Sequence, residues 1–317
     1  MDISIIVPLY NESESLPELF SWIDKVMVEN AFSYEVLFVN DGSTDNSWEV
    51  IKKLQATHPA NVKGISFRRN YGKSPALYCG FAKAQGDVVI TMDADLQDSP
   101  DEIPGLYHMI VKENYDLVSG WKKKRYDGKL TKNIPSKIYN STARTITGLQ
   151  LHDMNCGLKA YRKVVIKHIE VYGEMHRYIP YLAKNAGFTR IGEKVVQHQK
   201  RKFGESKFGM ERFVNGYLDL ISLWFLNRFG KKPMHFFGLV GSLVFLVGLL
   251  AVIIVGATKF NALIQGIPAR LVTEQPAFYL SLTCMIIGVL LFLTGFLGEL
   301  VARNAPERNN YAVEEEL

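Results

Sequence analysis

Two long uncharged stretches near the C-terminus, residues 236–255 and 277–298, most constrain what this chain can fold into. Each reaches the roughly 20 apolar residues that a helix needs to cross a bilayer. Charged residues occur throughout the preceding part, so the near-zero mean hydropathy averages two unlike regions. A buried hairpin in a soluble core is the alternative, but it seldom needs two full-length uncharged runs. We therefore expect two membrane-spanning helices, at about 236–257 and 277–300.

The charges that flank these stretches favour a cytoplasmic position for both termini. Basic residues lie on the terminal side of the two stretches, at Arg228, Lys231, Lys232, Arg303 and Arg308. The connecting loop has only two, so the bias follows the positive-inside rule, although it is modest. The N-terminus, MDISIIVPLYNE, has no basic segment of the signal-peptide type. Three scattered cysteines without paired spacing are consistent with a reducing compartment.

Residues 1–208 alternate between short apolar runs and amphipathic segments. The expected strands are 3–7, 34–39, 62–67, 88–92 and 116–119, and the expected helices are 15–30, 46–57, 74–84 and 101–113. Capping boxes at Ser15 with Glu18 and at Ser99 with Glu102 mark two helix starts. This alternation predicts an α/β fold with a doubly wound, mostly parallel sheet.

Three segments complete the expected domain plan. Residues 209–232 read as an interfacial amphipathic helix with Trp224 and Phe225 in the headgroup layer, or else as an ordinary packing helix. The two spans occupy 233–303. Residues 304–317, which end in AVEEEL, are expected to form a frayed, solvated cytosolic tail.

Polar residues follow three of the expected strands. Tyr10, Asn11 and Glu12 follow the first, Asp41 follows the second, and the aspartates of the MDADLQD segment follow the fourth. Ligands of open α/β sheets bind beyond these carboxyl ends. An Asp-x-Asp pair there can hold a divalent cation through hard oxygen ligands, and the cation can bind a diphosphate. The alternative is that the aspartates merely turn the chain.

Several other classes of protein lack support in the sequence. No G-x-G-x-x-G follows the first strand and no P-loop motif occurs, which disfavours a dinucleotide fold and a P-loop ATPase. The Asp-x-Asp pair follows the fourth strand, whereas haloacid-dehalogenase phosphatases carry theirs after the first. A net charge of +5 suits an anionic membrane surface, but no basic stripe with stacking aromatics suggests nucleic acid.

Six motifs together carry a resemblance to a known family. They are PLYNE at 8–12, NDGSTD at 40–45, RNYGK at 69–73, MDADLQDSP at 92–100, DMNCGLKAYR at 153–162 and RKFGESK at 201–207. The chain resembles glycosyltransferase family 2, and within it the polyprenyl-phosphate glycosyltransferases, which include dolichyl-phosphate mannose synthase and the bactoprenol glucosyltransferases. The resemblance implies a GT-A fold and an inverting sugar transfer from a nucleotide sugar to a lipid phosphate.

The resemblance also implies roles for residues on the donor side. The positions expected to bind the nucleotide sugar are Pro8, Tyr10, Glu12, Asp41, Lys73, Asp93 and Arg201. Asp95 and Gln97, with Asp93 through water or facing the sugar, are expected to hold Mg²⁺ or Mn²⁺ with the donor diphosphate. Lys73 reads equally well as a surface lysine.

On the acceptor side, the resemblance points to basic residues and to a mobile R-x-x-G-x-S-K loop that contains Gly204. The expected phosphate-binding residues are Lys122, Arg125, Lys132, Ser136, Arg177, Ser206 and Lys207. Lys122 and Lys132 replace arginines of the family and forfeit bidentate recognition. Asp153 matches the catalytic base, and Asp93 also counts as catalytic. A phosphate monoester is already largely dianionic at pH 7, so Asp153 alternatively orients the acceptor.

The expected function is transfer of glucose from UDP-glucose to undecaprenyl phosphate at the cytosolic membrane face, for modification of a cell-envelope glycan. The alternatives are a GDP-mannose-dependent mannosyltransferase, a processive polysaccharide synthase and a non-enzymatic membrane subunit. No Q-x-x-R-W motif of the processive enzymes occurs, and the acids are retained. Gly238-x-x-x-Ser242 and Thr294-x-x-x-Gly298 are small-residue faces that suit a homo-oligomer.

Overall fold

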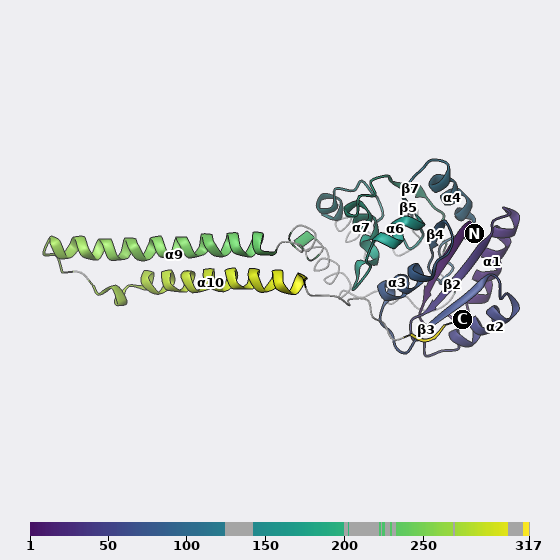
Figure 1. Ribbon diagram of the computed structural model, residues 1–317, viewed down its shortest axis with the longest axis horizontal. Coiled ribbons are helices and arrows are strands. Elements are labelled where there is room, and N and C mark those ends of the chain that lie inside the picture. The colour runs from purple at the N-terminus through teal and green to yellow at the C-terminus, as the bar shows by residue number, and fades with distance from the viewer. Residues whose placement is uncertain are drawn as a thin grey trace. The chain divides into compact units, whose positions relative to one another are not determined.

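The computed structural model describes residues 1–123, 142–199, 202, 222, 224–225, 229, 233–268, 270–303 and 313–316. They divide into two compact units, Met1–Leu220 with Arg308–Leu317 and Ile221–Glu307 (Figure 1). Arg201 and the acceptor-phosphate candidates Arg125, Lys132, Ser136, Ser206 and Lys207 lie outside the described residues, as does most of the expected interfacial helix.

The first unit is built on a mixed sheet. Its described strands are β1 (Ile3–Leu9), β2 (Tyr34–Asn40), β3 (Val62–Phe67), β4 (Val88–Thr91), β5 (Leu117–Trp121), β6 (Lys159–Arg162), β7 (Ile191–Val195) and β8 (Val313–Glu316). They lie in the order β7-β5-β6-β4-β1-β2-β3-β8. The β4-β1-β2-β3 pairs are parallel, whereas β6 is antiparallel to both of its neighbours.

Helices cover both faces of this sheet (Figure 1). They are α1 (Leu16–Glu29), α2 (Ser47–Thr57), α3 (Lys73–Lys83), α4 (Ile103–Val111), α6 (Lys163–His168) and α7 (Ile179–Asn185), with 3₁₀ turns η1 (Pro100–Glu102) and η2 (Met175–Tyr178). On β1, Ile3, Ile5 and Val7 belong to the core that also contains the buried residues of α1 and α4. Ile6 faces the other way, where Gly80 of α3 lies against it. The predicted doubly wound arrangement is confirmed.

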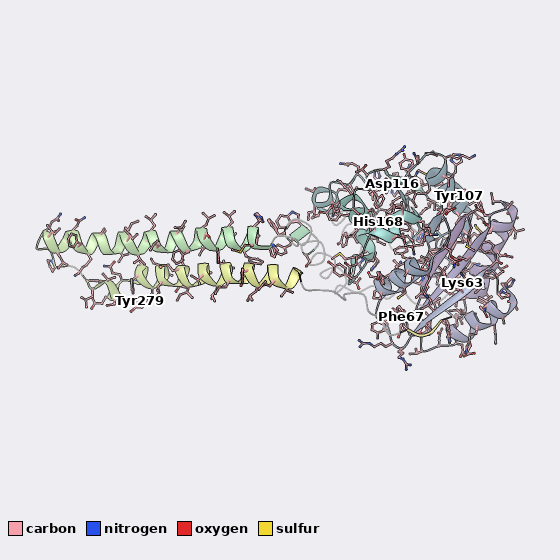
Figure 2. The ribbon with its side chains drawn as sticks, viewed as in Figure 1. Lys63, Phe67, Tyr107, Asp116, His168 and Tyr279 are labelled. Atoms are coloured by element: carbon pink, nitrogen blue, oxygen red, sulfur yellow. The ribbon has the colours of Figure 1, made fainter. Side chains whose placement is uncertain are left out.

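A polar cluster is buried among the central strands. Ser4 donates to Glu35 Oε1 at 2.5 Å, and Lys63 Nζ lies 2.7 Å from Glu35 Oε2. Ser4 and Glu35 are fully buried, and Lys63 comes from β3 (Figure 2). Burial raises the pKa of Glu35, but bonds from Lys63, Ser4 and the Gln85 amide outweigh it and leave that pKa below the ordinary value.

The two predicted capping boxes are wrong. Ser15 already has helical backbone angles, so its hydroxyl donates to the Glu12 carbonyl at 2.9 Å instead of capping α1. Ser99 does accept from the Asp101 amide, as an N-cap should. Glu102, however, turns away to pair with Lys194 and to accept from the Gln197 amide. A local carbonyl therefore takes the Ser15 hydroxyl, and tertiary partners take the Glu102 carboxylate.

The C-terminal tail also differs from expectation. Val313–Glu316 form β8, which pairs antiparallel with β3, with Ile65 opposite Glu316 and Phe67 opposite Val313. The prediction of a frayed end is wrong for these residues. The edge of β3 has backbone N–H and C=O groups that can pair with any extended segment. Because this pairing uses the backbone alone, an acidic segment can form it as well as an apolar segment can.

The second unit is a pair of long apolar helices, α9 (Pro233–Ile264) and α10 (Pro276–Arg303), joined through the turn η3 (Val272–Glu274). By length and composition both can cross a membrane, as the sequence predicts. They pack closely through glycines, because a Cβ on Gly241 or Gly288 would lie 2.6 Å from the carbonyl oxygen of the other. Gly295 and Gly298 likewise face residues 233–238 of α9, so these small residues serve the hairpin itself.

Candidate active site

The loop after β4 brings the predicted metal ligands together. Leu96 has a φ of 58°, in the left-handed region that a leucine rarely adopts. The resulting turn lets the Gln97 amide donate to Asp95 Oδ1 at 3.1 Å. Backbone strain of this kind collects at functional sites, where surrounding contacts maintain it. Asp95 and Gln97 therefore lie on one constrained turn at the carboxyl end of a central strand.

Asp93, on the same loop, is held by an ammonium group and by a glycine. Lys73, at the start of α3, forms an ion pair with Asp93, so it is not a free surface lysine. Burial raises the pKa of Asp93, but Lys73 and Lys122 outweigh it, and the pKa lies well below the usual range. A Cβ on Gly157 would lie 2.3 Å from Asp93 Oδ2, so any larger residue there would displace this carboxylate. Asp93 is thus an oriented, ionised carboxylate.

The chemistry of these side chains fits a divalent cation. Asp95 and Gln97 offer a carboxylate and an amide oxygen, the donors that Mg²⁺ and Mn²⁺ prefer. The part of the chain that the structure describes contains no cluster of three or more His, Cys, Asp or Glu residues arranged to hold a metal. Two protein oxygens leave coordination positions for the oxygens of a substrate diphosphate, so the set suits a cation that binds together with its substrate.

The loops after β1 and β2 are joined into one surface. The Asn11 amide donates to Ser43 at 2.9 Å, and Asn11 Oδ1 accepts from the Thr44 amide at 2.8 Å. The Glu12 amide donates to Ser47 at 3.0 Å. Asn11 has a φ of 58°, a second left-handed residue at this edge. Tyr10 and Glu12 consequently occupy a loop that Ser43, Thr44 and Ser47 hold in place, and Pro8 lies just before it in β1.

Asp41 fixes the next loop of the site. Its carboxylate accepts from the amides of Tyr71 at 2.7 Å and Gly72 at 2.9 Å. Burial raises the pKa of Asp41, and these two amides offset that effect only in part. Gly42 has a φ of 66°, and a Cβ there would lie 2.3 Å from the Arg69 backbone. Asp41 therefore positions the loop that carries Lys73, in addition to any contact with a nucleoside.

Asp153 is buried, and its backbone amide is held by Glu193 of β7. Glu193 Oε1 accepts from the amides of His152 at 2.8 Å and Asp153 at 3.0 Å. Glu193 Oε2 lies 2.7 Å from His152 Nδ1, and the His152 ring stacks on Trp121 at 4.0 Å between centroids. The Asp153 carboxylate accepts from the Asn155 amide at 3.2 Å. The segment that follows, through Gly157, reaches Asp93, so the structure brings these two predicted catalytic aspartates to one region.

Lys122 is largely buried, and its ammonium lies 2.6 Å from Oδ1 of the fully buried Asp98. Burial lowers the pKa of Lys122, but Asp98, Cys156 and Asp93 raise it well above the ordinary value. Asp98 is also bridged to His198 through backbone pairing. Lys122 thus neutralises the acid beside the metal loop.

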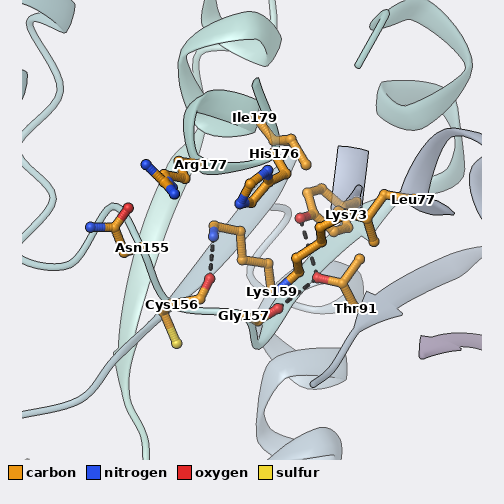
Figure 3. A pocket seen from close by; sticks show the side chains of 11 residues that line it. Lys73, Leu77, Thr91, Asn155, Cys156, Gly157, Lys159, His176, Arg177 and Ile179 are labelled. Atoms are coloured by element: carbon orange, nitrogen blue, oxygen red, sulfur yellow. Dashed lines mark hydrogen bonds between the residues drawn. The ribbon is translucent and has the colours of Figure 1, made fainter. Parts of the chain in front are cut away.

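Figure 3 shows a narrow pocket whose lining includes Lys73 and Gly157. Both of these residues lie against Asp93. The pocket is lined by cationic and hydroxyl side chains from separate elements, among them Lys73, Thr91, Lys159, Tyr161, His176 and Arg177. Of the two predicted acceptor residues that the structure describes, Lys122 and Arg177, Arg177 lines this pocket. Sequence reasoning missed Lys159, Glu193 and Gly157. A lysine between Leu158 and Ala160, in an otherwise apolar run, was the available signal for Lys159.

Residues 4–170 match the family described as glycosyl transferase family 2. The chain belongs to this family. It is 34% identical over 304 residues to dodecaprenyl-phosphate galacturonate synthase of Rhizobium johnstonii. This alignment covers 96% of the chain and 88% of the relative. It is 35% identical over 302 residues to undecaprenyl-phosphate 4-deoxy-4-formamido-L-arabinose transferase of Shewanella sediminis. That alignment covers 95% of the chain and 87% of the relative.

Solved structures show the same fold. Glucosyl-3-phosphoglycerate synthase of Mycobacterium tuberculosis, in complex with Mn²⁺, UDP-glucose and phosphoglyceric acid, aligns with a TM-score of 0.52. The identity is 18%, and the alignment covers 71% of this chain and 79% of that one. The predicted GT-A type of sheet is therefore confirmed, and membership of glycosyl transferase family 2 makes the protein a transferase enzyme. The non-enzymatic alternative is excluded.

Proposed function

We propose that this enzyme transfers a sugar from a UDP-sugar to polyprenyl phosphate, with undecaprenyl phosphate as the natural acceptor, for modification of a cell-envelope glycan. The observation that carries the proposal is the extent of the likeness. Relatives named for transfer to dodecaprenyl and undecaprenyl phosphate match 96% and 95% of the chain, which includes both the site and the two apolar helices. A lipid acceptor accounts for those helices, because it lies in the membrane that they can span.

The reaction needs little proton transfer. A phosphate oxygen of the acceptor attacks the anomeric carbon, the bond from that carbon to the diphosphate oxygen breaks, and the nucleoside diphosphate leaves with the bonding electrons. Attack from the opposite side inverts the anomeric configuration. Because the acceptor phosphate is largely dianionic at pH 7, the role proposed for the buried Asp153 is to orient the acceptor or to stabilise positive charge on the sugar.

Asp95 and Gln97 would hold a divalent cation, either Mg²⁺ or Mn²⁺, and the Mn²⁺ in the related solved structure supports this assignment. When bound, the cation supplies positive charge for the departing diphosphate. The side chains of the protein act around it. Pro8, Tyr10 and Glu12 receive the nucleoside, Lys73 orients Asp93 toward the sugar, and Arg201, Ser206 and Lys207 close on the phosphates.

The proposed location is the inner or plasma membrane, with two spans and with the catalytic domain and both termini in the cytoplasm. The apolar lengths of α9 and α10 and the flanking basic residues support it. Arg125, Lys132, Ser136 and Arg177, with Lys122, remain the proposed acceptor-phosphate residues. A homo-oligomer stays a proposal, although the glycines of the hairpin already pack against each other.

The sugar is the open part of the proposal. Glucose follows from the resemblance, and GDP-mannose is the alternative donor of that kind. The relatives are named for galacturonate and for 4-deoxy-4-formamido-L-arabinose, so UDP-linked forms of these two sugars are candidates on equal footing.

The test is transfer from a panel of radiolabelled nucleotide sugars to undecaprenyl phosphate by the full-length enzyme in detergent. We expect a glycolipid from one donor, no product after EDTA treatment, and at least a roughly 100-fold loss in Asp95→Ala. Asp87→Ala is the matched control, because Asp87 is an exposed aspartate just before the same strand, at its opposite end. This control should retain wild-type turnover.

Two outcomes would contradict the proposal. If the protein binds nucleotide normally but no donor gives a lipid product, polyprenyl phosphate is not the acceptor. If a polymer accumulates instead of a single-sugar glycolipid, a processive synthase explains the chain better.

A further inference from the structure

Lys159 on β6 is an unusual lysine. Its side chain lies in the sheet with only 3% of the residue exposed. Its ammonium donates to the carbonyl oxygen of Cys156. Within the described part of the chain, that carbonyl is the only partner of the ammonium, and no carboxylate forms an ion pair with it. Lysines are almost never fully buried without a partner of opposite charge.

Its surroundings compensate this charge only in part. Burial lowers the pKa of Lys159 and the nearby ammonium of Lys73 lowers it further, while Cys156, Asp153 and Asp93 raise it without restoring the ordinary value. Lys167, an exposed lysine of α6, serves as a comparison. Its ammonium donates to two backbone carbonyls, of Phe81 at 2.7 Å and Ala82 at 2.9 Å, and it lines no part of the pocket.

The ammonium of Lys159 points into the narrow pocket, toward Arg177 and His176 (Figure 3). Arg177 is 9% exposed and comes from η2, and the nearest paired carboxylate, that of Glu174, lies 3.5 Å away. Lys73 closes the side next to Asp93, with which it is paired. The pocket therefore gathers positive charge from three separate elements, which is the arrangement that an anionic group would stabilise.

We propose that Lys159 and Arg177 bind a carboxylate on the donor sugar, so that the sugar transferred is a uronic acid. This proposal assigns Arg177 to the donor in place of the acceptor phosphate. This inference rests on the proposed function and specifies its donor. The pocket adjoins Asp93, the acid expected to face the sugar, through both Lys73 and Gly157. Thr91 and Tyr161 add hydroxyl groups to its lining, which suit the polar edge of a sugar ring.

The other anion in the reaction, the acceptor phosphate, fits this pocket less well. It is attached to a polyprenyl chain that needs an open path to the bilayer. A narrow pocket that ends at a buried ammonium offers no room for that chain. A carboxylate at the end of a sugar ring is small and terminal, so it can reach Lys159 while the anomeric carbon stays near Asp93.

The experiment compares matched donors that differ only in the carboxylate, namely UDP-galacturonate with UDP-galactose and UDP-glucuronate with UDP-glucose. For the full-length enzyme with undecaprenyl phosphate, we expect kcat/KM to favour a uronate over its neutral partner by about 100-fold. Lys159→Met should reduce this preference by a similar factor. Lys167→Met, the matched control, should keep the wild-type preference.

The remaining outcomes separate this inference from the proposed function. Efficient transfer of a neutral hexose with no preference for a uronate would overturn the inference but leave polyprenyl-phosphate transfer standing. A Lys159→Met variant with a raised KM for undecaprenyl phosphate and an unchanged donor preference would assign the pocket to the acceptor. Absence of lipid product from every donor would overturn both. If Lys159→Met does not fold, the wild-type preference and Arg177→Gln decide the matter.

Discussion

At the scale of single residues, the site depends on partners that are far apart in the chain. Asp41 holds the amide of Tyr71, 30 positions later, and Glu193 holds the amide of Asp153, 40 positions earlier. In each case a carboxylate accepts a hydrogen bond from the backbone of a loop and fixes its position. The loop then positions another functional side chain. Sequence motifs identified Asp41 and Asp153, but they could not assign the clamping role of Glu193.

Gly157 gives a prediction at this scale. Gly157→Ala places a methyl group against the Asp93 carboxylate, where a Cβ would lie 2.3 Å from Oδ2. The carboxylate must shift, and a misplacement of about 1 Å in an active site can cost about 100-fold in turnover. We expect a loss of this size in glycosyl transfer, measured with the donor that the wild type uses. Gly256→Ala is the control, since nothing lies within 4 Å of its Cβ position. Equal activity of the two variants would refute the close contact.

At the scale of elements, the predicted strands were those with long apolar runs. β1, β2 and β3 carry such runs and pair in parallel as expected. β6 has four residues, two of them basic, and no local pattern marks it as a strand. It forms because β4 and β5 both need a hydrogen-bonding partner in the interior of the sheet. That insertion brings Lys159 and Gly157 beside Asp93.

Glu35 tests how the central strands are held together. Glu35→Gln removes a buried carboxylate that Lys63 neutralises and to which Ser4 donates, and we expect a loss of about 2 kcal/mol in unfolding free energy at pH 7. Because the folded pKa lies below the ordinary 4.5, the contribution is complete above that pH and is lost as pH falls through the folded pKa. The difference between wild type and variant should therefore shrink below about pH 4.5.

Denaturant unfolding of the solubilised chain, followed by tryptophan fluorescence, measures this difference. Glu49→Gln is the matched control, since Glu49 pairs with Lys52 on the surface with 61% of its side chain exposed. Such an exposed pair should contribute less than about 1 kcal/mol. A Glu35→Gln variant as stable as this control would show that the buried ion pair contributes nothing net.

At the scale of the whole molecule, the chain leaves the first unit, forms the apolar hairpin and returns. Residues 308–317 belong to the same compact unit as the N-terminal domain, although the hairpin separates them in sequence. β8 covers the edge of β3, which would otherwise expose unpaired backbone groups. The last residues thus complete the sheet that carries the nucleotide-binding loops.

Removal of residues 313–317 should therefore expose the β3 edge. We expect the amides of residues 65–67 that bond to β8 to exchange at least about tenfold faster, because their pairing partner is lost. A variant with Glu314, Glu315 and Glu316 changed to Gln keeps the strand and removes its charge, so it should retain protection. If the truncated chain exchanges as slowly as the full one, β8 does not protect this edge.

By itself, the sequence determined the classes of structure that the chain could adopt. The alternation of short apolar runs and amphipathic segments predicted an α/β domain, and two uncharged runs predicted long apolar helices. Six motifs indicated the family and the aspartates of the candidate site. These are local properties of composition and spacing. Only the tertiary structure decided that β6 enters the sheet antiparallel, that Lys159 faces the pocket and that the tail pairs with β3. Those outcomes depend on which backbone edges and buried charges remain unpaired after the other elements have packed, which no local pattern records.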